Sequence, residues 1–355
     1  MKSCPSPFSL GPRLASLEAN LAPYAARSSE AVREREEPGC PFRGAYQRDR
    51  DRILHCRPFR RLAHKTQVFI ANAGDHHRTR LTHTLEVSQI ARTLARCFSL
   101  NEDLAEATAL GHDLGHTPFG HAGERTLAQL SENGFAHQRH SLRLVEKLIN
   151  GQGLNLTQAV RDGIAKHSKG RGPIFVEGPA APQTYEGRLV RVADIIAYLA
   201  HDLDDACRAE LVDPQGVPSG VNRVFGTRAA TRVRAMVEDL LANSEPTPQG
   251  LALGFSAAME EAMEELRGYL QEKVYSHPKL EAELNKGEAI IRLIHGRLME
   301  DDGLSGFLEL GLAESRSQAA VDFIAGMTDR FAIQFGEALK SGRAPDGALL
   351  GRLLS

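Results

Sequence analysis

Cysteine is scarce in this chain, and no two cysteines lie close together. The five are Cys4, Cys40, Cys56, Cys97 and Cys207, and none of them forms a Cys-x-x-Cys pair. Such spacing argues against a zinc site built from cysteines and against a disulfide framework. It favours a reducing compartment, so we expect a cytoplasmic protein.

Long apolar runs, phosphate-binding glycine loops and repeats are missing as well. No stretch approaches the roughly 18 uncharged apolar residues that a membrane-spanning helix needs, and the first residues lack the apolar core of a secretion signal. We find no Walker P-loop, no Gly-x-Gly-x-x-Gly fingerprint and no internal repeat. The formal net charge of −2 creates no overall field that would attract nucleic acid. The remaining composition is that of an ordinary globular protein, and 355 residues allow one large domain or two.

Apolar residues recur at helical spacing through most of the chain. Ile90 and Leu94 belong to a stripe with a period of about 3.6 residues, and Asn101 is a typical N-cap for the helix that follows. Further helices are expected at 136–149, 187–211, 255–274, 286–299 and 316–340. The strand signals are short and lie at Val68–Ile70 and Ile174–Val176. The sequence therefore predicts an all-α fold.

We expect three parts along the chain. Residues 1–42 read as an extended or partly ordered arm, 43–211 as the core that carries the chemistry, and 212–355 as a helical C-terminal part that packs on the core. The core begins with a basic run, 43–65, in which arginines and aspartates alternate. This run is either a solvated helix face or a surface that faces phosphate or another subunit, because arginine offers paired donors to phosphate.

Histidine is concentrated in the middle of the chain. Of the 14 histidines, 12 lie between His55 and His201. The run from Gly111 to Glu124 alone holds three histidines and two carboxylates, and the alternative for any single one is an ordinary core or surface residue. Imidazole and carboxylate together suit Mn²⁺, Fe²⁺, Co²⁺ or Zn²⁺, and such an ion with open positions for water is a hydrolytic centre.

Helical spacing places several of these residues on buried or shared faces. His83 lies four positions before Val87, near the buried edge of its helix, and His112 and Asp113 are expected in the last turn of the helix that Asn101 begins. Thr117 and Pro118 are expected to open the next helix, as N-cap and first position. On that helix His121 and Glu124 are three apart, and on the 187–211 helix Asp194, Tyr198 and Asp202 are spaced by four, so each set shares a face.

Four longer sequence segments carry a resemblance to a known family. They occupy residues 60–69, 78–87, 111–124 and 322–329. His83, His112-Asp113 and Asp194 match the H…HD…D pattern of HD-domain phosphohydrolases. Together with this pattern, the four segments resemble the bacterial deoxyguanosine-triphosphate triphosphohydrolase family. The resemblance runs from about Arg48 to Asp329, which is most of the chain.

The resemblance implies a fold, a reaction and a set of roles. The fold is an HD-domain helical bundle with additional C-terminal helices, and the reaction is hydrolysis of a deoxynucleoside triphosphate to deoxynucleoside and tripolyphosphate. The cofactor is a divalent metal ion, Mn²⁺, Mg²⁺, Co²⁺ or Fe²⁺. By position, the metal ligands are His83, His112, Asp113 and Asp194; the catalytic pair is His121 and Glu124; the phosphate contacts are Arg80, His116 and His137; and the residues around the deoxyribose are Gln67, Tyr198 and Asp202.

Two departures and two alternatives stay open at this point. Ile195 stands where some relatives look polar, and the loop 169–186 has no counterpart that we can place. One alternative is another HD phosphohydrolase, acting on nucleoside monophosphates or cyclic dinucleotides. The other is a regulatory protein that binds nucleotides or single-stranded nucleic acid through 43–65. The candidate partners are therefore a dNTP substrate, a nucleotide effector, single-stranded DNA and further copies of the chain, with no membrane.

Overall fold

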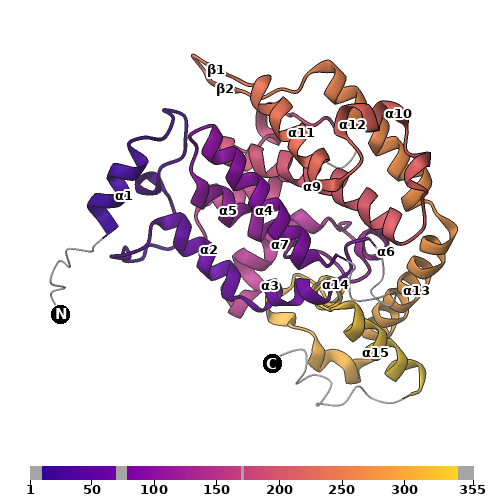
Figure 1. Ribbon diagram of the computed structural model, residues 1–355. Coiled ribbons are helices and arrows are strands. Elements are labelled where there is room, and N and C mark those ends of the chain that lie inside the picture. Colours follow the sequence, from indigo (N-terminus) through magenta and orange to yellow (C-terminus); the bar gives the residue numbers. More distant parts are fainter. Residues whose placement is uncertain (1–9, 69–77, 169–171, 343–355) are drawn as a thin grey trace.

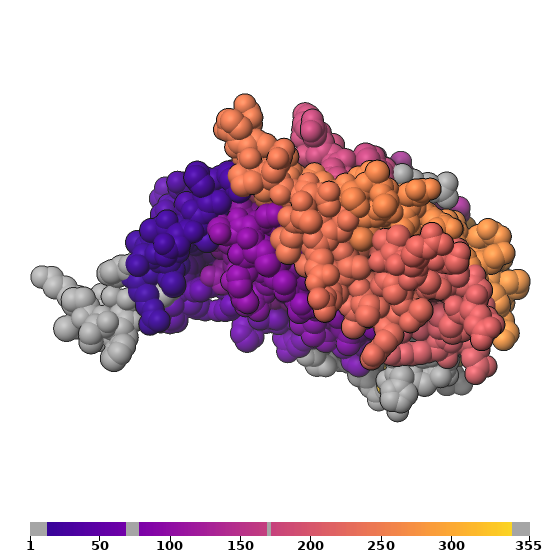
Figure 2. Space-filling model, turned by 45° about the horizontal axis from the view of Figure 1, so that its top comes forward, coloured from indigo at the N-terminus to yellow at the C-terminus, as the bar shows by residue number. Residues whose placement is uncertain are grey.

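The computed structural model describes residues 10–68, 78–168 and 172–342. This part of the chain is almost entirely helical, and its sheet is a single antiparallel hairpin of β1 (Glu245–Thr247) and β2 (Gly250–Ala252). The all-α prediction is therefore confirmed. The hairpin projects from the body of the molecule, as the ribbon and space-filling views both show (Figures 1 and 2). None of the described helices is long and apolar enough to cross a membrane.

The centre of the fold is built around one long helix, α9 (Tyr185–Arg208), which is buried along most of its length. Against it pack α4 (Arg80–Cys97), α5 (Glu102–Gly111) and α8 (Gln158–Lys166). The stripe predicted for α4 enters this core, where Ile90 and Leu94 are buried. Because α4, α5, α8 and α9 meet here, polar residues on their inward faces are brought together.

The N-terminal segments wrap around one side of this centre. They are α1 (Leu10–Glu18), the short turn η1 (Ser28–Glu30), α2 (Ala45–His55), α3 (Arg57–Arg61) and the turn η2 (Leu62–His64). The predicted arm is fastened to the core by charged hydrogen bonds: Arg33 pairs with buried Asp49, and the Ala26 N–H donates to Glu186 at 3.0 Å. The domain boundaries at 42 and 211 stay predictions.

The middle and C-terminal segments complete the bundle. The former are α6 (Gly120–Leu130), α7 (His137–Arg143), a π-helical turn (Leu144–Leu148) and the short turns η5 (Ile149–Gly151), η6 (Gly178–Ala180) and η7 (Pro214–Gly216). The latter are α10 (Ser219–Phe225), α11 (Ala229–Ala242), α12 (Ala257–Tyr269), a π-helical turn (Leu270–Tyr275), α13 (Pro278–Glu300), η9 (Asp302–Phe307), η10 (Leu310–Leu312), α14 (Arg316–Ala325) and α15 (Asp329–Lys340). In Figure 1, α10–α12 lie beside α9, while α13–α15 form a separate group. That group shares a second apolar cluster with α6, through Phe119 and Leu127.

Several local predictions were wrong. Residues 174–176 are not a strand: the Arg191 side chain occupies the carbonyls of Pro173 and Ile174, at 3.0 and 3.1 Å, where a strand partner would bind. Phe69 and Ile70 of the other strand prediction lie outside the described residues. The hairpin of β1 and β2 lies in a segment for which no strand was predicted.

Helix ends account for the remaining differences. The helix predicted at 316–340 is two helices, since Thr328 caps α15 by accepting from the Phe331 N–H at 3.2 Å. The next helix after His112 is capped by Phe119, in the left-handed region at φ 60°, and not by Thr117. Ile195, one of the two departures, is buried in the apolar core.

Candidate metal centre and active site

The His112-Asp113 pair lies just beyond the end of α5. Asn101 caps the start of that helix, as predicted, by accepting from the Leu104 N–H at 3.2 Å. The helix ends at Gly111, so His112 is its C-cap and Asp113 lies in the turn that follows. Both residues were predicted to lie within the last turn of the helix. Ser141 fixes this turn, because its hydroxyl donates to the His112 carbonyl and accepts from the Gly115 N–H, both at 2.8 Å.

Three elements bring a first group of ligand-type atoms together. His83 on α4 lies with its Nε2 3.0 Å from Oδ1 of Asp194 on α9. The same carboxylate oxygen is 4.0 Å from His112 Nε2, which is also 3.8 Å from Oδ2 of Asp113. The structure thus brings the four predicted metal-binding residues close together, from α4, from the end of the next helix, α5, and from α9, which lies further along the chain.

The donor atoms in this cluster fit a divalent cation. The His112 Nδ1 donates to the Ala109 carbonyl at 2.6 Å, so its Nε2 carries a lone pair. That Nε2 is buried and has no hydrogen-bond partner among the described residues. A bare imidazole nitrogen beside two carboxylates is what a borderline divalent ion requires, and HD domains bind such ions.

Both carboxylates are held in the charged form. Burial raises the pKa of Asp113, but Arg80 and the surrounding histidines outweigh burial and hold that pKa well below its usual range. For Asp194, the hydrogen bond from His83 and the nearby His112 overcome burial and lower the pKa to about 2. Anionic carboxylates are the form that binds a metal.

A second group surrounds Glu124 on α6. Its Oε1 accepts from both the backbone N–H and the ring Nδ1 of His137, each at 2.8 Å. Its Oε2 is 3.4 Å from Nδ1 of His121, whose side chain is 75% exposed, and 3.7 Å from Nε2 of His116. The predicted pair of His121 and Glu124 is therefore present, but His137 holds the carboxylate more closely. Burial raises the pKa of Glu124, yet its hydrogen bonds to His121 and His137 prevail and keep that pKa well below normal.

Arg80 lies between these two groups and is almost completely buried. Its Nη1 donates to Oδ2 of Asp113 at 2.6 Å. Its Nε and Nη2 are also buried, and neither finds a hydrogen-bond partner in the described part of the chain. Nearby, the rings of His116 and His137 stack with centroids 4.8 Å apart, and His116 Nε2 likewise lacks a partner among described atoms. Buried guanidinium donors without partners are costly, so Arg80 makes this corner suited to an anionic ligand.

The residues predicted around the sugar are less tightly assembled. Tyr198 and Asp202 follow Asp194 along α9, and Asp202 accepts a 2.6 Å hydrogen bond from the Tyr275 hydroxyl. Burial raises the pKa of Asp202 to about 6, against the opposing effect of Tyr275. Gln67 has a buried Oε1 that no described residue satisfies, and no recorded hydrogen bond joins Gln67 to Tyr198 or Asp202.

Two residues of the site were missed by sequence reasoning. His167 is the C-cap of α8, and its Nε2 lies 3.1 Å from Nε2 of His137. The sequence signal was available, since His167 lies within the histidine-rich span from His55 to His201. Tyr275 belongs to a π-helical turn 73 positions after Asp202, and no local pattern links the two.

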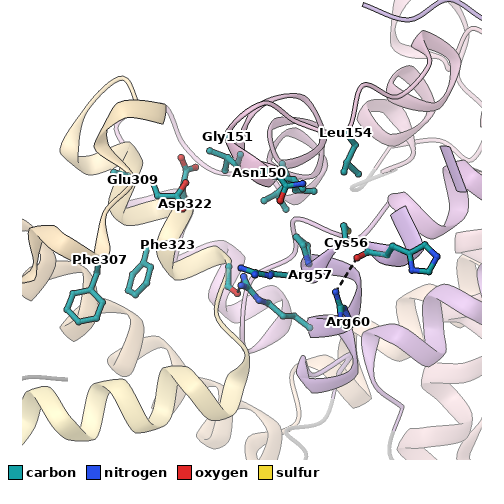
Figure 3. A pocket seen from close by; sticks show the side chains of 18 of the residues that line it. Cys56, Arg57, Arg60, Asn150, Gly151, Leu154, Phe307, Glu309, Asp322 and Phe323 are labelled. Carbon is teal, nitrogen blue, oxygen red and sulfur yellow. Dashed lines mark hydrogen bonds between the residues drawn. The ribbon is translucent and has the colours of Figure 1, made fainter. Parts of the chain in front are cut away.

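A separate cavity of about 780 Å³ lies between the N-terminal and C-terminal segments. Figure 3 shows Arg57 and Arg60 on one side and Phe307 and Phe323 on the other. Arg52 and Arg61 also line it, together with Glu309 and Asp322. The four predicted metal-binding residues do not line this cavity, so it is distinct from the histidine cluster.

Comparison with known proteins agrees with this geometry. Residues 80–199 match the HD domain, and residues 253–337 match the phosphohydrolase-associated domain. The chain is 49% identical to a deoxyguanosinetriphosphate triphosphohydrolase-like protein of Desulfatibacillum aliphaticivorans, over 88% of this chain and 92% of that one. It is 47% identical to a protein of the same description from Caldanaerobacter subterraneus subsp. tengcongensis, over 88% and 90%. The chain therefore belongs to the deoxyguanosinetriphosphate triphosphohydrolase-like family of HD-domain phosphohydrolases.

Proposed function

We propose that this protein hydrolyses deoxynucleoside triphosphates to the deoxynucleoside and tripolyphosphate, with the help of a divalent metal ion. The observation that carries the proposal is Arg80, a buried guanidinium with two unpaired nitrogens among the described residues, beside the cluster of histidines and carboxylates. A phosphate chain supplies the anionic oxygens that these donors lack. The names of the relatives support the same substrate class.

In this proposal His83, His112, Asp113 and Asp194 hold the metal. A divalent ion bound there supplies Lewis acidity toward phosphoryl oxygens and lowers the pKa of bound water. Mn²⁺, Mg²⁺, Co²⁺ and Fe²⁺ are the candidates. The chain itself contributes preorganised ligands, because the Ala109 carbonyl fixes the orientation of the His112 ring before any ion arrives.

His121 and Glu124 are proposed as the catalytic pair. The leaving 5′-oxygen gains from a proton donor, and His121 is the exposed imidazole at the edge of the buried group. Glu124 is fixed by His137 on one oxygen, which leaves the other oxygen free to orient His121. The 3.4 Å contact between Nδ1 of His121 and Glu124 is long for a hydrogen bond, so we expect it to shorten when substrate is bound.

The remaining roles follow from position. Arg80, His116 and His137 are proposed to contact the phosphates, because the free guanidinium donors of Arg80 and the stacked rings of His116 and His137 lie beside the metal ligands. Gln67 and Asp202 are proposed to bind the 3′-hydroxyl, and the Tyr198 ring to pack beneath C2′. A packed ring discriminates against an added hydroxyl only modestly, by roughly 10²-fold, so ribonucleotides should be poorer substrates and still measurable ones.

A panel assay tests the proposal. The four dNTPs, the four NTPs, nucleoside monophosphates and a cyclic dinucleotide are each incubated with Mn²⁺, Mg²⁺ or Co²⁺, and the products are separated by ion exchange. We expect tripolyphosphate and deoxynucleoside to form together from dNTPs. Stepwise release of orthophosphate, or turnover confined to monophosphates or cyclic dinucleotides, would contradict the proposal and favour another HD phosphohydrolase.

A nucleotide effector is a second proposal, which the arginine-lined cavity supports. Its volume of about 780 Å³ lies in the range of ligand sites, and the Arg57 side chain forms no hydrogen bond or ion pair with any described residue. Single-stranded DNA binding through 43–65, self-association and a cytoplasmic location stay predictions.

A further inference from the structure

We infer that the C-terminal segment, residues 253–337, positions α6 relative to the metal-binding residues, with Asp329 and Gly287 as its positioning residues. This segment matches the phosphohydrolase-associated domain, whose description gives it no separate task. The inference rests on the function proposed above, in which α6 carries the catalytic pair, His121 and Glu124. It concerns how that pair is held at a fixed distance from the metal-binding residues.

The two halves of the proposed active site belong to different apolar clusters. The helices α4 and α9, which carry His83 and Asp194, pack in the central cluster. The start of α6 packs through Phe119 and Leu127 in another cluster, whose other buried members come from residues 291–339. Among the described residues, no buried apolar cluster contains both α6 and α4 or α9. Contacts between the halves therefore have to fix the distance between the catalytic pair and the metal-binding residues.

Asp329 supplies such a contact, because its two carboxylate oxygens bind two different segments. Its Oδ1 accepts from the Phe119 N–H, directly before α6, and its Oδ2 accepts from the Thr66 N–H, each at 2.9 Å. The Thr66 hydroxyl donates to the same Oδ2. Next to Thr66, the Lys65 carbonyl accepts from the N–H of Arg80, the first residue of α4, at 3.1 Å. One buried carboxylate therefore joins the start of α4 to the residue that caps α6.

Phe119 is held a second time, through its ring. It caps α6 in the left-handed conformation, at φ 60°, and its buried ring lies against Gly287 of α13. A Cβ atom at position 287 would lie 2.6 Å from Cγ of this ring, closer than real Cβ atoms approach their neighbours. The close approach requires glycine at 287, so α13 limits how far the start of α6 can move.

Two exposed contacts continue the attachment of α6 to α13. Arg125 of α6 pairs with Glu288, and Arg292 of α13 donates to Gln129. Exposed pairs of this kind contribute little energy. The main restraint therefore lies at the start of α6, in the turn that directly precedes His121.

The expected consequence for catalysis is a matter of distance. A general acid has to lie within hydrogen-bond reach of the leaving oxygen. A displacement of about 1 Å, caused by a change away from the chemistry, can cost about 10²-fold in rate. Asp329 and Gly287 form no recorded hydrogen bond or ion pair with the four metal-binding residues among the described part of the chain. Loosening the start of α6 should therefore lower kcat and leave metal binding intact.

Two pairs of variants of the full chain test the inference. Asp329→Asn leaves one acceptor oxygen in place of two. Its matched control is Asp239→Asn, because Asp239 of α11 likewise accepts a backbone N–H and a hydroxyl, both from Ser256, at 2.8 and 2.6 Å. Gly287→Ala introduces the clashing Cβ, and its matched control is Gly296→Ala, on the same helix, where the added Cβ meets open space.

The kinetic measurement is kcat at saturating concentration of the nucleotide that the parent chain cleaves fastest in the panel. We expect kcat to fall by about 10- to 100-fold in Asp329→Asn and in Gly287→Ala, with bound Mn²⁺ per chain at the parent value. Both controls should keep the parent kcat. In a His121→Ala background, Asp329→Asn should lower kcat by less than about twofold, because no imidazole is left to position. Structural damage alone would lower kcat by the same factor in both backgrounds.

Hydrogen exchange with Mn²⁺ and without nucleotide gives a measurement that needs no activity. Exchange should speed up in the peptides that contain Thr66 or Phe119 in Asp329→Asn, while peptides of α9 keep the parent rate. Unchanged exchange, an unchanged kcat in both test variants, or a loss of metal in proportion to kcat would each overturn the inference. Losses that multiply with that of His121→Ala would overturn it as well.

Failure of this inference can be told apart from failure of the proposed function. If the parent chain cleaves a nucleotide other than a dNTP, the proposed function fails, and this test proceeds on that nucleotide. If dNTP hydrolysis stands while Asp329→Asn and Gly287→Ala behave like their controls, only the positioning role of the C-terminal segment fails.

Discussion

The histidine cluster and the arginine-lined cavity differ in the kind of ionisable side chain they contain and in how deeply it is buried. In the cluster, the His112 ring is 1% exposed, and its Nε2, which has no hydrogen-bond partner among the described residues, faces the carboxylates of Asp113 and Asp194. In the cavity, Arg57 and Arg60 are exposed, and their permanent charge stays in contact with water. Buried imidazole can serve as a cation ligand because it can be neutral, whereas guanidinium offers only donors. The first region is therefore prepared for cations and the second for anions.

The two regions are joined by a structural brace. Lys65 is buried and donates to the carbonyls of His116 and Ala325, and Asp329 accepts from the Phe119 and Thr66 N–H groups at 2.9 Å each. The segment 322–329 therefore anchors the turn that starts α6. It shows that part of the family signature serves the fold around the site and does not itself touch the metal-binding residues.

The largest expected effect comes from Asp113→Ala. Asp113 neutralises buried Arg80 and faces ligands on both sides, so its loss leaves an unpaired buried charge as well as a broken metal site. We expect bound metal to fall to background and dNTP turnover to fall by more than roughly 10⁴-fold, beyond what one general acid contributes. Metal content and turnover are measured on the same preparation. Arg57→Ala in the cavity is the control, and a metal count unchanged by Asp113→Ala would contradict the assignment.

His121→Ala should separate chemistry from metal binding. His121 is 75% exposed and does not touch the first metal group, so metal content should stay at the parent value. Turnover should fall by roughly 10²–10⁴-fold, the usual contribution of a general acid. The two measurements are kcat at saturating dNTP and the metal content of the purified variant. A loss of metal in His121→Ala would show that His121 is a ligand, and an unchanged kcat would show that it is an exposed surface residue.

The sequence predicted the partners of the cluster better than the turns that hold it. The family resemblance grouped His83, Asp113 and Asp194, and the structure places their side chains around His112. The cap at Phe119 could not, since its left-handed conformation depends on Asp329, 210 positions away. The contact of His167 with His137 could not be predicted for the same reason, because only the fold packs α8 against α7.

Asp202→Asn should change stability and its pH dependence. Burial raises the pKa of Asp202 to about 6, above the roughly 3.9 of an unfolded chain. The unfolded state then releases its proton first, so stability falls as pH rises from about 4 to 6 and is flat above. Asparagine does not ionise, so the variant avoids this loss of stability, and its amide oxygen still accepts the hydrogen bond from Tyr275. We expect the free energy of unfolding of the variant to exceed that of the parent by up to about 3 kcal/mol at pH 8. At pH 5 this gain should be about 1 kcal/mol smaller.

Urea unfolding of parent and variant at both pH values measures this difference. Asp205→Asn is a matched control on the same helix, since Asp205 pairs with Arg78 and its replacement breaks that pair. A variant that is less stable than the parent at pH 8 would show that the native fold stabilises the Asp202 carboxylate, so that the pKa of Asp202 is lowered and not raised.

The smallest expected effect concerns the cavity. Arg57→Ala removes one exposed cation, and exposed charge pairs contribute little, so affinity for inorganic tripolyphosphate should fall only about 1.5- to 5-fold. The loss should be visible by calorimetry at low salt and vanish at high salt, because exposed charges are screened there. Metal content should stay unchanged, since Arg57 lies in the cavity and not in the histidine cluster.

If Arg57→Ala instead lowered metal binding, the two regions would be coupled through the Lys65 and Asp329 brace, and the division into a cation site and an anion site would fail. If tripolyphosphate affinity did not change at low salt, the cavity would bind no phosphate chain and the effector proposal would lose its support.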